Sequence, residues 1–136
     1  MEFLFIPAMI FCHIVDDFYL QGLLAKYKQK QWWESNYPDH LYRNDYKVSL
    51  IIHSISWAWM IQLPILIWMF TTQTFTLRAV LVYVCTWISN IIIHAFIDNA
   101  KANWLMISLT FDQATHLIQI LLSWAFWRSM VYVTTL

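Results

Sequence analysis

Four long apolar stretches constrain the fold of this chain more than any other feature of its sequence. They cover residues 3–24, 48–70, 75–97 and 104–127, and each is rich in Ile, Leu, Val, Phe and Trp. A helix needs about 20 mostly apolar residues to cross the hydrocarbon core of a bilayer, whereas a barrel strand needs only about 9–11. We therefore expect an all-α, polytopic membrane protein with four transmembrane helices in an antiparallel bundle, and residues 1–136 as a single domain.

The composition supports lipid as the solvent for most of the chain. Hydrophobic residues make up 60% of the sequence and charged residues 12%, against about 25% charged residues in soluble domains. Nine Trp and seven Tyr suit aromatic belts at the two membrane interfaces. The formal net charge of zero provides no basic field for nucleic acid. These observations disfavour a soluble enzyme, a nucleic-acid-binding module and a disordered tail, and they predict membrane lipids as partners.

One substantial polar segment, residues 25–47, separates the first two apolar stretches. Its lysines and the paired Trp32 and Trp33 suit a loop that lies in the headgroup layer. Most basic residues flank this loop or the third connection, on one side of the bundle: Lys26, Lys28, Lys30, Arg43, Lys47 and Lys101. The positive-inside rule places that side in the cytoplasm and both termini outside, as in a bacterial inner-membrane protein. Because Glu2 stands where a signal peptide has basic residues, we expect residue 1 to begin a span rather than a cleaved leader.

Polar residues in and beside the four stretches recur at intervals of three or four, so each stretch carries one polar face. Three His/Asp pairs are spaced i,i+4, which places both side chains one turn apart on the same face. Because the helices alternate in direction, the polar residues of all four should fall in the cytoplasmic half of the bundle. These residues are His13 and Asp17, His53, His94 and Asp98, and Asp112 and His116.

Carboxylates in a low-dielectric interior need compensation, and three of these residues are aspartates. Since no Lys or Arg lies deep in a stretch, we expect a divalent cation to neutralise them. Mixed imidazole and carboxylate ligation suits Zn, Mn or Fe without choosing among them. The predicted metal ligands are His13, Asp17, His53, His94, Asp98, Asp112 and His116. Two alternatives stay open: a hydrogen-bonded network that joins the helices without metal, and the passage of protons or ions.

Other polar residues lead to different predictions. Asp16 should point off the polar face of its helix, toward the loop side or a neighbouring helix, and His40 should be an exposed loop histidine. Lys101 either clamps a substrate phosphate or anchors a helix end at the headgroups, and we favour the anchor. Because amides seldom bind metal where carboxylates are near, the following residues should only support the site: Gln21, Asn90, Gln113 and Gln119.

A particular order of polar residues runs along nearly the whole chain: His13-x-x-x-Asp17-Phe18 with Gln21, then His53, then His94-x-x-x-Asp98 with Lys101, and last Asp112-Gln113-x-x-His116. This order resembles the small membrane proteins of bacteria and their phages that are grouped as domain of unknown function 3307. The resemblance implies a four-helix membrane protein whose biochemical role is undetermined. More distantly, the chain is similar in residue types to small membrane proteins described as metal-dependent hydrolases.

Two functions from different classes fit these expectations. The first is a membrane-embedded metal-dependent hydrolase of a lipid-linked or phosphate-bearing substrate at the inner leaflet. Its general base would be Asp17 or Asp112, and Lys26 or Lys101 would stabilise developing negative charge. The second is a non-enzymatic phage or host membrane factor whose polar core only specifies its fold.

Overall fold

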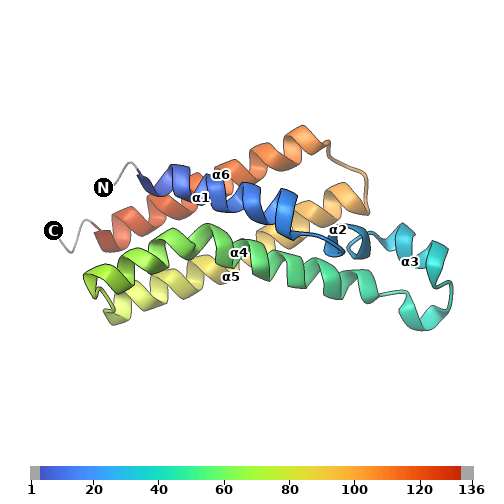
Figure 1. Ribbon diagram of the computed structural model, residues 1–136, viewed down its shortest axis with the longest axis horizontal. Coiled ribbons are helices and arrows are strands. Elements are labelled where there is room, and N and C mark those ends of the chain that lie inside the picture. Colours follow the sequence, from blue (N-terminus) through green and yellow to red (C-terminus); the bar gives the residue numbers. More distant parts are fainter. Residues whose placement is uncertain (1–3, 133–136) are drawn as a thin grey trace.

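The computed structural model of this protein describes residues 4–132, which form helices and turns without a β-strand. The prediction of an all-α fold is confirmed. An antiparallel bundle contains four long helical segments: α1 (Phe5–Ile14) with the π-helix η2 (Val15–Leu20), α4 (Asp45–Thr72), α5 (Leu77–Ala102), and α6 (Leu109–Trp127) with the π-helix η4 (Arg128–Tyr132) (Figure 1). The predicted start of the first span at residue 3 and the predicted external termini concern residues outside the described range.

Two helix boundaries differ from the predicted ones because a side chain forms an ion pair or caps the helix end. α5 continues beyond residue 97 to Ala102, because Asp98 and Lys101 form ion pairs within the protein instead of ending the helix. α6 begins at Leu109 rather than at residue 104, since the Ser108 hydroxyl caps it by accepting a hydrogen bond from the Phe111 N–H at 3.2 Å. The first segment changes from α to π geometry after Ile14 and ends at Leu20.

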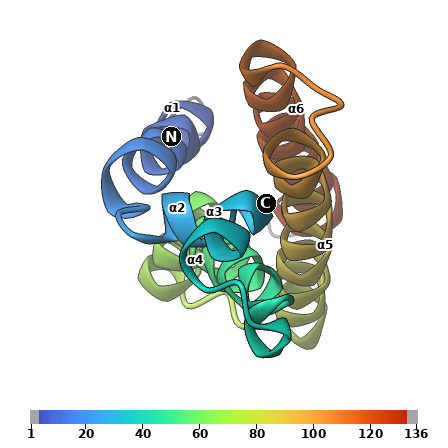
Figure 2. The ribbon, with the colours of Figure 1, turned by 90° about the vertical axis from the view of Figure 1, so that its right-hand side faces the viewer.

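The polar segment predicted as a loop over residues 25–47 contains short helices. These are α2 (Leu24–Tyr27), α3 (Lys30–Asn36) and the 3-10 helix η3 (His40–Tyr42), and they lie at the end of the bundle where α4 begins (Figures 1 and 2). Asn103, which follows α5, fastens the junction between α2 and α3. Its amide nitrogen donates to the Lys28 carbonyl at 3.1 Å, and its amide oxygen accepts from the Lys30 N–H at 2.7 Å.

The interior of the bundle is apolar in one half and polar in the other, and its outer faces are largely apolar. An apolar core that includes Trp57, Ile61 and Trp127 fills the half of the bundle near the α4–α5 turn. The other half buries His, Asp, Asn and Gln side chains. Large apolar side chains cover the outer faces of all four long segments; Phe11, for example, is 66% exposed and Ile92 is 63% exposed. A monomer in water rarely exposes so continuous an apolar surface.

Within residues 4–132, two helical segments are long and apolar enough to cross a membrane, His40–Thr72 and Leu77–Ala102. The mean hydropathy of their most apolar windows is 1.7 and 2.0. The polar face of α6, with Asp112, His116 and Gln119, lowers its hydropathy, and α1 with η2 is shorter than the other segments. Membrane crossing by α6 and by α1 with η2 therefore stays a prediction.

The turn after η2 contains Gly22 with a φ of 49°, in the left-handed region. We predict that Gly22→Ala lowers the free energy of unfolding by about 1 kcal/mol, because residues with a Cβ are disfavoured there. The added Cβ would meet only the Leu20 carbonyl oxygen, at 3.7 Å, so the loss arises from the backbone and not from a clash. Thermal unfolding of the purified protein in detergent measures the change.

Leu105, with a φ of 54°, provides the opposite substitution as a control. Leu105→Gly should leave the unfolding midpoint unchanged or raise it, because glycine relieves the same strain. A similar loss of stability in Gly22→Ala and Leu105→Gly would contradict the backbone explanation.

Candidate metal centre

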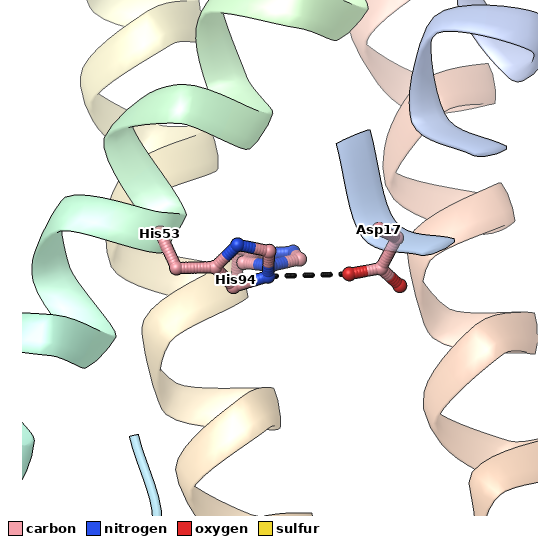
Figure 3. Close-up of side chains that lie close together, drawn as sticks. All are labelled: Asp17, His53 and His94. Atoms are coloured by element: carbon pink, nitrogen blue, oxygen red, sulfur yellow. Dashed lines mark hydrogen bonds and ion pairs between the residues drawn. The ribbon is translucent and has the colours of Figure 1, made fainter. Parts of the chain in front are cut away.

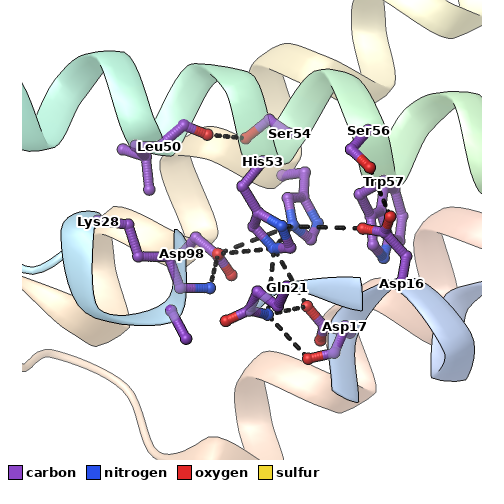
Figure 4. Close-up of polar contacts among 12 residues, drawn as sticks. Asp16, Asp17, Gln21, Lys28, Leu50, His53, Ser54, Ser56, Trp57 and Asp98 are labelled. Carbon is purple, nitrogen blue, oxygen red and sulfur yellow. Dashed lines mark hydrogen bonds and ion pairs between the residues drawn. The ribbon is translucent and has the colours of Figure 1, made fainter. Parts of the chain in front are cut away.

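All four long helical segments contribute to one buried polar cluster at the end of the bundle near α2, and Figure 4 shows the part of it between η2, α4 and Asp98 of α5. Each predicted metal ligand is buried, and Asp17 is the most accessible of them with 6% of its side chain exposed. The contributing residues are His13 from α1, Asp17 from η2, His53 from α4, His94 and Asp98 from α5, and Asp112 and His116 from α6. The four polar faces therefore meet at one level of the bundle.

A first group of possible ligand atoms surrounds the Nε2 atom of His53. This atom lies 3.2 Å from Asp17 Oδ1 and 3.2 Å from His94 Nε2 (Figure 3). Asp98 Oδ2 lies 3.4 Å from the same nitrogen. The ligand atoms of Asp17, His53 and His94 all lie within 4.8 Å of one another, so a single ion could contact all three.

A second group consists of His94, Asp98 and His116 and shares two residues with the surroundings of His53. His116 Nε2 lies 3.5 Å from Asp98 Oδ1 and 3.4 Å from Asp112 Oδ1. Asp98 faces both groups, because its other oxygen lies 3.4 Å from His53 Nε2 and 3.7 Å from His94 Nε2. Its carboxylate thus lies between the histidines of α4 and α6.

Hydrogen bonds alone do not satisfy these ring nitrogens. A neutral imidazole has one N–H and one lone pair, whereas the single Nε2 atom of His53 faces two carboxylates and another imidazole. Several His–Asp separations, at 3.4–3.7 Å, exceed the hydrogen-bond range of about 2.7–3.2 Å. Ligand atoms about 2.1 Å from a tetrahedral ion would lie about 3.4 Å apart. Since both His116 ring nitrogens and Asp112 Oδ1 also lack hydrogen-bond partners among the described residues, the donor set fits a metal ion.

His13, although predicted as a ligand, lies outside both groups. The Trp57 indole N–H donates to its Nδ1 at 2.8 Å, so its Nε2 carries the proton and donates to the Gln113 amide oxygen at 3.1 Å. The Gln113 amide nitrogen in turn donates to Asp17 Oδ2 at 2.9 Å and to Asp112 Oδ2 at 3.0 Å. Both ring nitrogens of His13 are therefore occupied, and the residue orients the carboxylates through Gln113.

The π-helix η2 brings two adjacent aspartates against α4. Asp16 is 1% exposed and accepts a hydrogen bond from the Ser56 hydroxyl at 2.6 Å (Figure 4). Its other oxygen lies 3.8 Å from His53 Nδ1, on the side of the ring opposite the ligand atoms; carboxylates commonly accompany metal-binding histidines in this way. Of the two directions predicted for Asp16, the structure shows the one toward a neighbouring helix, α4; the α-helical period, which does not apply within a π-helix, could not show that Asp16 contacts the site there. No signal in the sequence marks this π-helix.

Two lysines reach the cluster from its end. Lys28 is 7% exposed and forms an ion pair with Asp98 Oδ2 (Figure 4), and Lys101 pairs with Asp112 Oδ2 at 2.8 Å. Lys101 is thus paired with a carboxylate of the cluster, and Lys28 reaches the cluster whereas Lys26, which the sequence favours for this role, is exposed. Sequence periodicity could not identify Lys28, because its partner is 70 residues away and Asn103 positions its backbone.

The charges of the cluster do not balance. It contains four carboxylates and two ammonium groups, so two negative charges remain when the histidines are neutral: the acids are Asp16, Asp17, Asp98 and Asp112, and the lysines are Lys28 and Lys101. Unpaired buried charges cost several kcal/mol each. The lysines reduce the excess charge that the sequence predicts, and one divalent cation would balance the rest.

Replacing Lys28 tests whether its ion pair is buried and structural. Lys28→Met should lower the free energy of unfolding by about 3 kcal/mol, because it leaves Asp98 without its ammonium partner in the interior. Lys26→Met, at an exposed lysine two residues earlier, is the matched control and should change stability by no more than about 0.5 kcal/mol. Thermal unfolding in detergent compares the two variants, and equal effects would contradict the pairing of Lys28 with Asp98.

Comparisons of the chain with protein-family models, with curated proteins and with solved structures found no significant match. The relationship to domain of unknown function 3307 therefore stays a prediction from the order of the polar residues. The function of this chain has to be inferred from its own site, because a helical bundle as such does not imply an activity.

Proposed function

We propose that this protein is an integral membrane protein with four spans that binds a divalent metal ion near its cytoplasmic face. We further propose that the metal centre hydrolyses a lipid-linked or phosphate-bearing substrate. One observation carries the proposal: imidazole nitrogens of His53 and His94 converge with the carboxylates of Asp17 and Asp98 at separations suited to metal ligands. Asp112 and His116 extend the donor set on the side of α6.

The distribution of side chains supports insertion of the whole bundle. Large apolar side chains are exposed on α1 and α6 as well as on α4 and α5, although only the latter pair is apolar enough by hydropathy alone. Because the polar residues of α6 face the bundle interior, they would not contact lipid. The basic residues near α2 and α3 support a cytoplasmic location for that end of the bundle.

Charge and donor type support one metal ion over two. The two uncompensated negative charges match one divalent cation, and a second would leave a positive excess unless it displaced the lysines. Two imidazoles with two carboxylates form a mixed nitrogen and oxygen set, which suits Zn, Mn or Fe. Asp98 Oδ2 already accepts from Lys28, so this ammonium group would have to share or leave that oxygen when the ion binds.

The surrounding residues support hydrolysis as the chemistry. A divalent ion bound there would supply an activated water near neutral pH. Asp112 Oδ1 is buried without a hydrogen-bond partner among the described residues, so it can accept a proton. Lys101 keeps 31% of its side chain exposed while pairing with Asp112, so its ammonium group could stabilise negative charge on a phosphate that arrives from the cytoplasmic side. Asp17, the other candidate base, is held by Gln21 and Gln113.

A structural polar network is the second candidate, and one specific observation favours it. The hydrogen bonds from Trp57 through His13 and Gln113 to Asp17 join α4, α1, α6 and η2 without any ion. Together with the two lysine pairs, this chain of contacts could specify the bundle in a protein with no catalytic role. Metal content separates the two candidates.

Elemental analysis of the protein purified in detergent tests the metal centre. The wild type, after incubation with Zn, Mn or Fe and gel filtration, should retain about one equivalent of metal. His94→Ala and Asp98→Asn should each reduce retention by at least about ten-fold, since His94 belongs to both groups of possible ligands and Asp98 faces histidines of both. His40→Ala, at an exposed histidine of η3, is the matched control and should retain metal fully. A folded wild type without metal would exclude the hydrolase proposal.

Reporter fusions test the proposed topology. A reporter joined after Thr72, at the α4–α5 turn, should be external, and one joined after Met106, between α5 and α6, should be cytoplasmic. Protease accessibility in intact and permeabilised cells gives the location of each. Reversed locations would overturn the orientation, and two reporters on the same side would overturn the crossing by α5.

A further inference from the structure

Five aromatic rings gather on α2, α3, η3 and the connection between the last two. Trp33 and Tyr42 are nearly parallel, with ring centroids 6.4 Å apart and an interplanar angle of 16°. Tyr37 contacts both rings, at 5.7 Å from Trp33 and 5.3 Å from Tyr42. Tyr27 and Trp32 also contact Trp33, whose indole N–H donates to the Tyr27 carbonyl at 2.7 Å. This hydrogen bond fixes the orientation of the Trp33 ring.

A cavity of about 280 Å³, here called the aromatic pocket, is lined by Trp33, Tyr37 and Tyr42 together with charged residues of both signs. Glu34 and Asp39 are its acidic residues, and Arg43 is its arginine. The Glu34 side chain is 57% exposed, and its one ion pair among the described residues is with Lys30, at 3.3 Å. One Asp39 oxygen accepts from the Leu41 N–H at 2.8 Å, whereas Arg43 makes no ion pair with any residue from 4 to 132. The pocket therefore combines aromatic rings, an accessible carboxylate and a guanidinium group without an acidic partner.

We propose that the aromatic pocket binds the zwitterionic headgroup of a membrane phospholipid, one that carries both an ammonium group and a phosphate. The faces of Trp33, Tyr37 and Tyr42 attract the ammonium group through cation–π interactions. Glu34 adds a negative charge beside the rings, and the planar donors of Arg43 match the phosphate oxygens. Sites for drug-sized ligands begin at about 300 Å³, so this pocket suits a headgroup and not a whole lipid.

The location of the pocket favours a lipid as the source of this headgroup. α3 and η3 lie at the end of the bundle where α4 begins (Figures 1 and 2), which the proposed topology places at the cytoplasmic headgroup layer. Membrane anchoring alone requires only exposed aromatic side chains. Here the rings contact one another and line a cavity that also carries charged groups. The inference rests on the proposed membrane insertion and not on the metal centre, which shares no residue with the pocket.

Saturation-transfer NMR on the full chain in a sugar-based detergent tests the pocket with three soluble probes. The probes are glycerophosphocholine, choline and glycerol phosphate, which carry both charged groups, only the ammonium group and only the phosphate. The wild type should bind glycerophosphocholine at least about five-fold more tightly than either of the others. Tyr37→Leu should weaken glycerophosphocholine and choline, whereas Arg43→Gln should weaken glycerophosphocholine and glycerol phosphate but leave choline unchanged.

Matched controls remove one aromatic and one basic residue outside the pocket. Trp104→Leu and Lys47→Gln should bind all three probes like the wild type. Absence of saturation transfer to glycerophosphocholine in the wild type would overturn the proposal, and so would equal losses in the pocket variants and the controls. Because Tyr37→Leu should keep its metal content, failure here is distinguishable from failure of the metal centre.

Native mass spectrometry then distinguishes a lipid from a free phosphoester. Wild-type protein extracted from vesicles with equal amounts of phosphatidylcholine and phosphatidylglycerol should retain phosphatidylcholine, and Tyr37→Leu should retain less of it. Preferential retention of phosphatidylglycerol, which has no ammonium group, would contradict recognition of a zwitterionic headgroup, and retention of neither lipid would contradict a lipid as the occupant. Alkaline extraction of cell membranes tests the insertion itself, because it releases peripheral proteins and leaves integral ones in the membrane pellet. Recovery of the chain in the soluble fraction would refute membrane insertion, and with it the lipid as the source of the headgroup.

Discussion

Asp98 lies among three histidines and a lysine, and every long segment of the bundle except the first contributes a neighbour to it directly. Its carboxylate accepts from Lys28, faces His53 and His94 with one oxygen, and faces His116 with the other. In an interior of low dielectric constant, a charge of this kind persists only where its neighbours are held in place. The short helices α2 and α3 and the hydrogen bonds of Asn103 to Lys28 and Lys30 hold the lysine neighbour in place. The long helices hold the three histidines.

The hydrogen bonds around the cluster have a direction that suits a cation at its centre. Trp57 donates to His13, His13 donates to Gln113, and Gln113 donates to Asp17 and Asp112. The outer oxygens of two carboxylates are thereby supplied with donors, while their other oxygens remain directed at histidines. Carboxylates and imidazoles oriented by surrounding hydrogen bonds are typical of metal sites. The same network would also stabilise the bundle, so structural and catalytic roles depend on the same contacts.

Much of this arrangement could be predicted from the sequence, because it follows from helical periodicity. The apolar stretches indicate the long helices, and the i,i+4 spacing of His94 with Asp98 and of Asp112 with His116 places each pair on one buried face. Contacts between segments far apart in sequence could not be predicted in this way. The partners of His13 are 44 and 100 residues away, and they remove it from the groups of possible ligands. The position of Asp16 depends on the π-helix η2, and the position of Lys28 depends on the hydrogen bond from Asn103 to its carbonyl. Hydropathy patterns provide no signal for either feature.

The most direct test of the central claim is zinc K-edge X-ray absorption on the zinc-loaded protein in detergent. The account predicts nitrogen and oxygen ligands at about 2.0–2.1 Å with multiple scattering from at least two imidazoles, as expected for either group of possible ligands, each of which has two histidines and an aspartate. Sulfur scattering at about 2.3 Å should be absent, because neither cysteine belongs to the cluster. A shell of oxygen atoms without imidazole scattering would contradict a metal centre built on these helices.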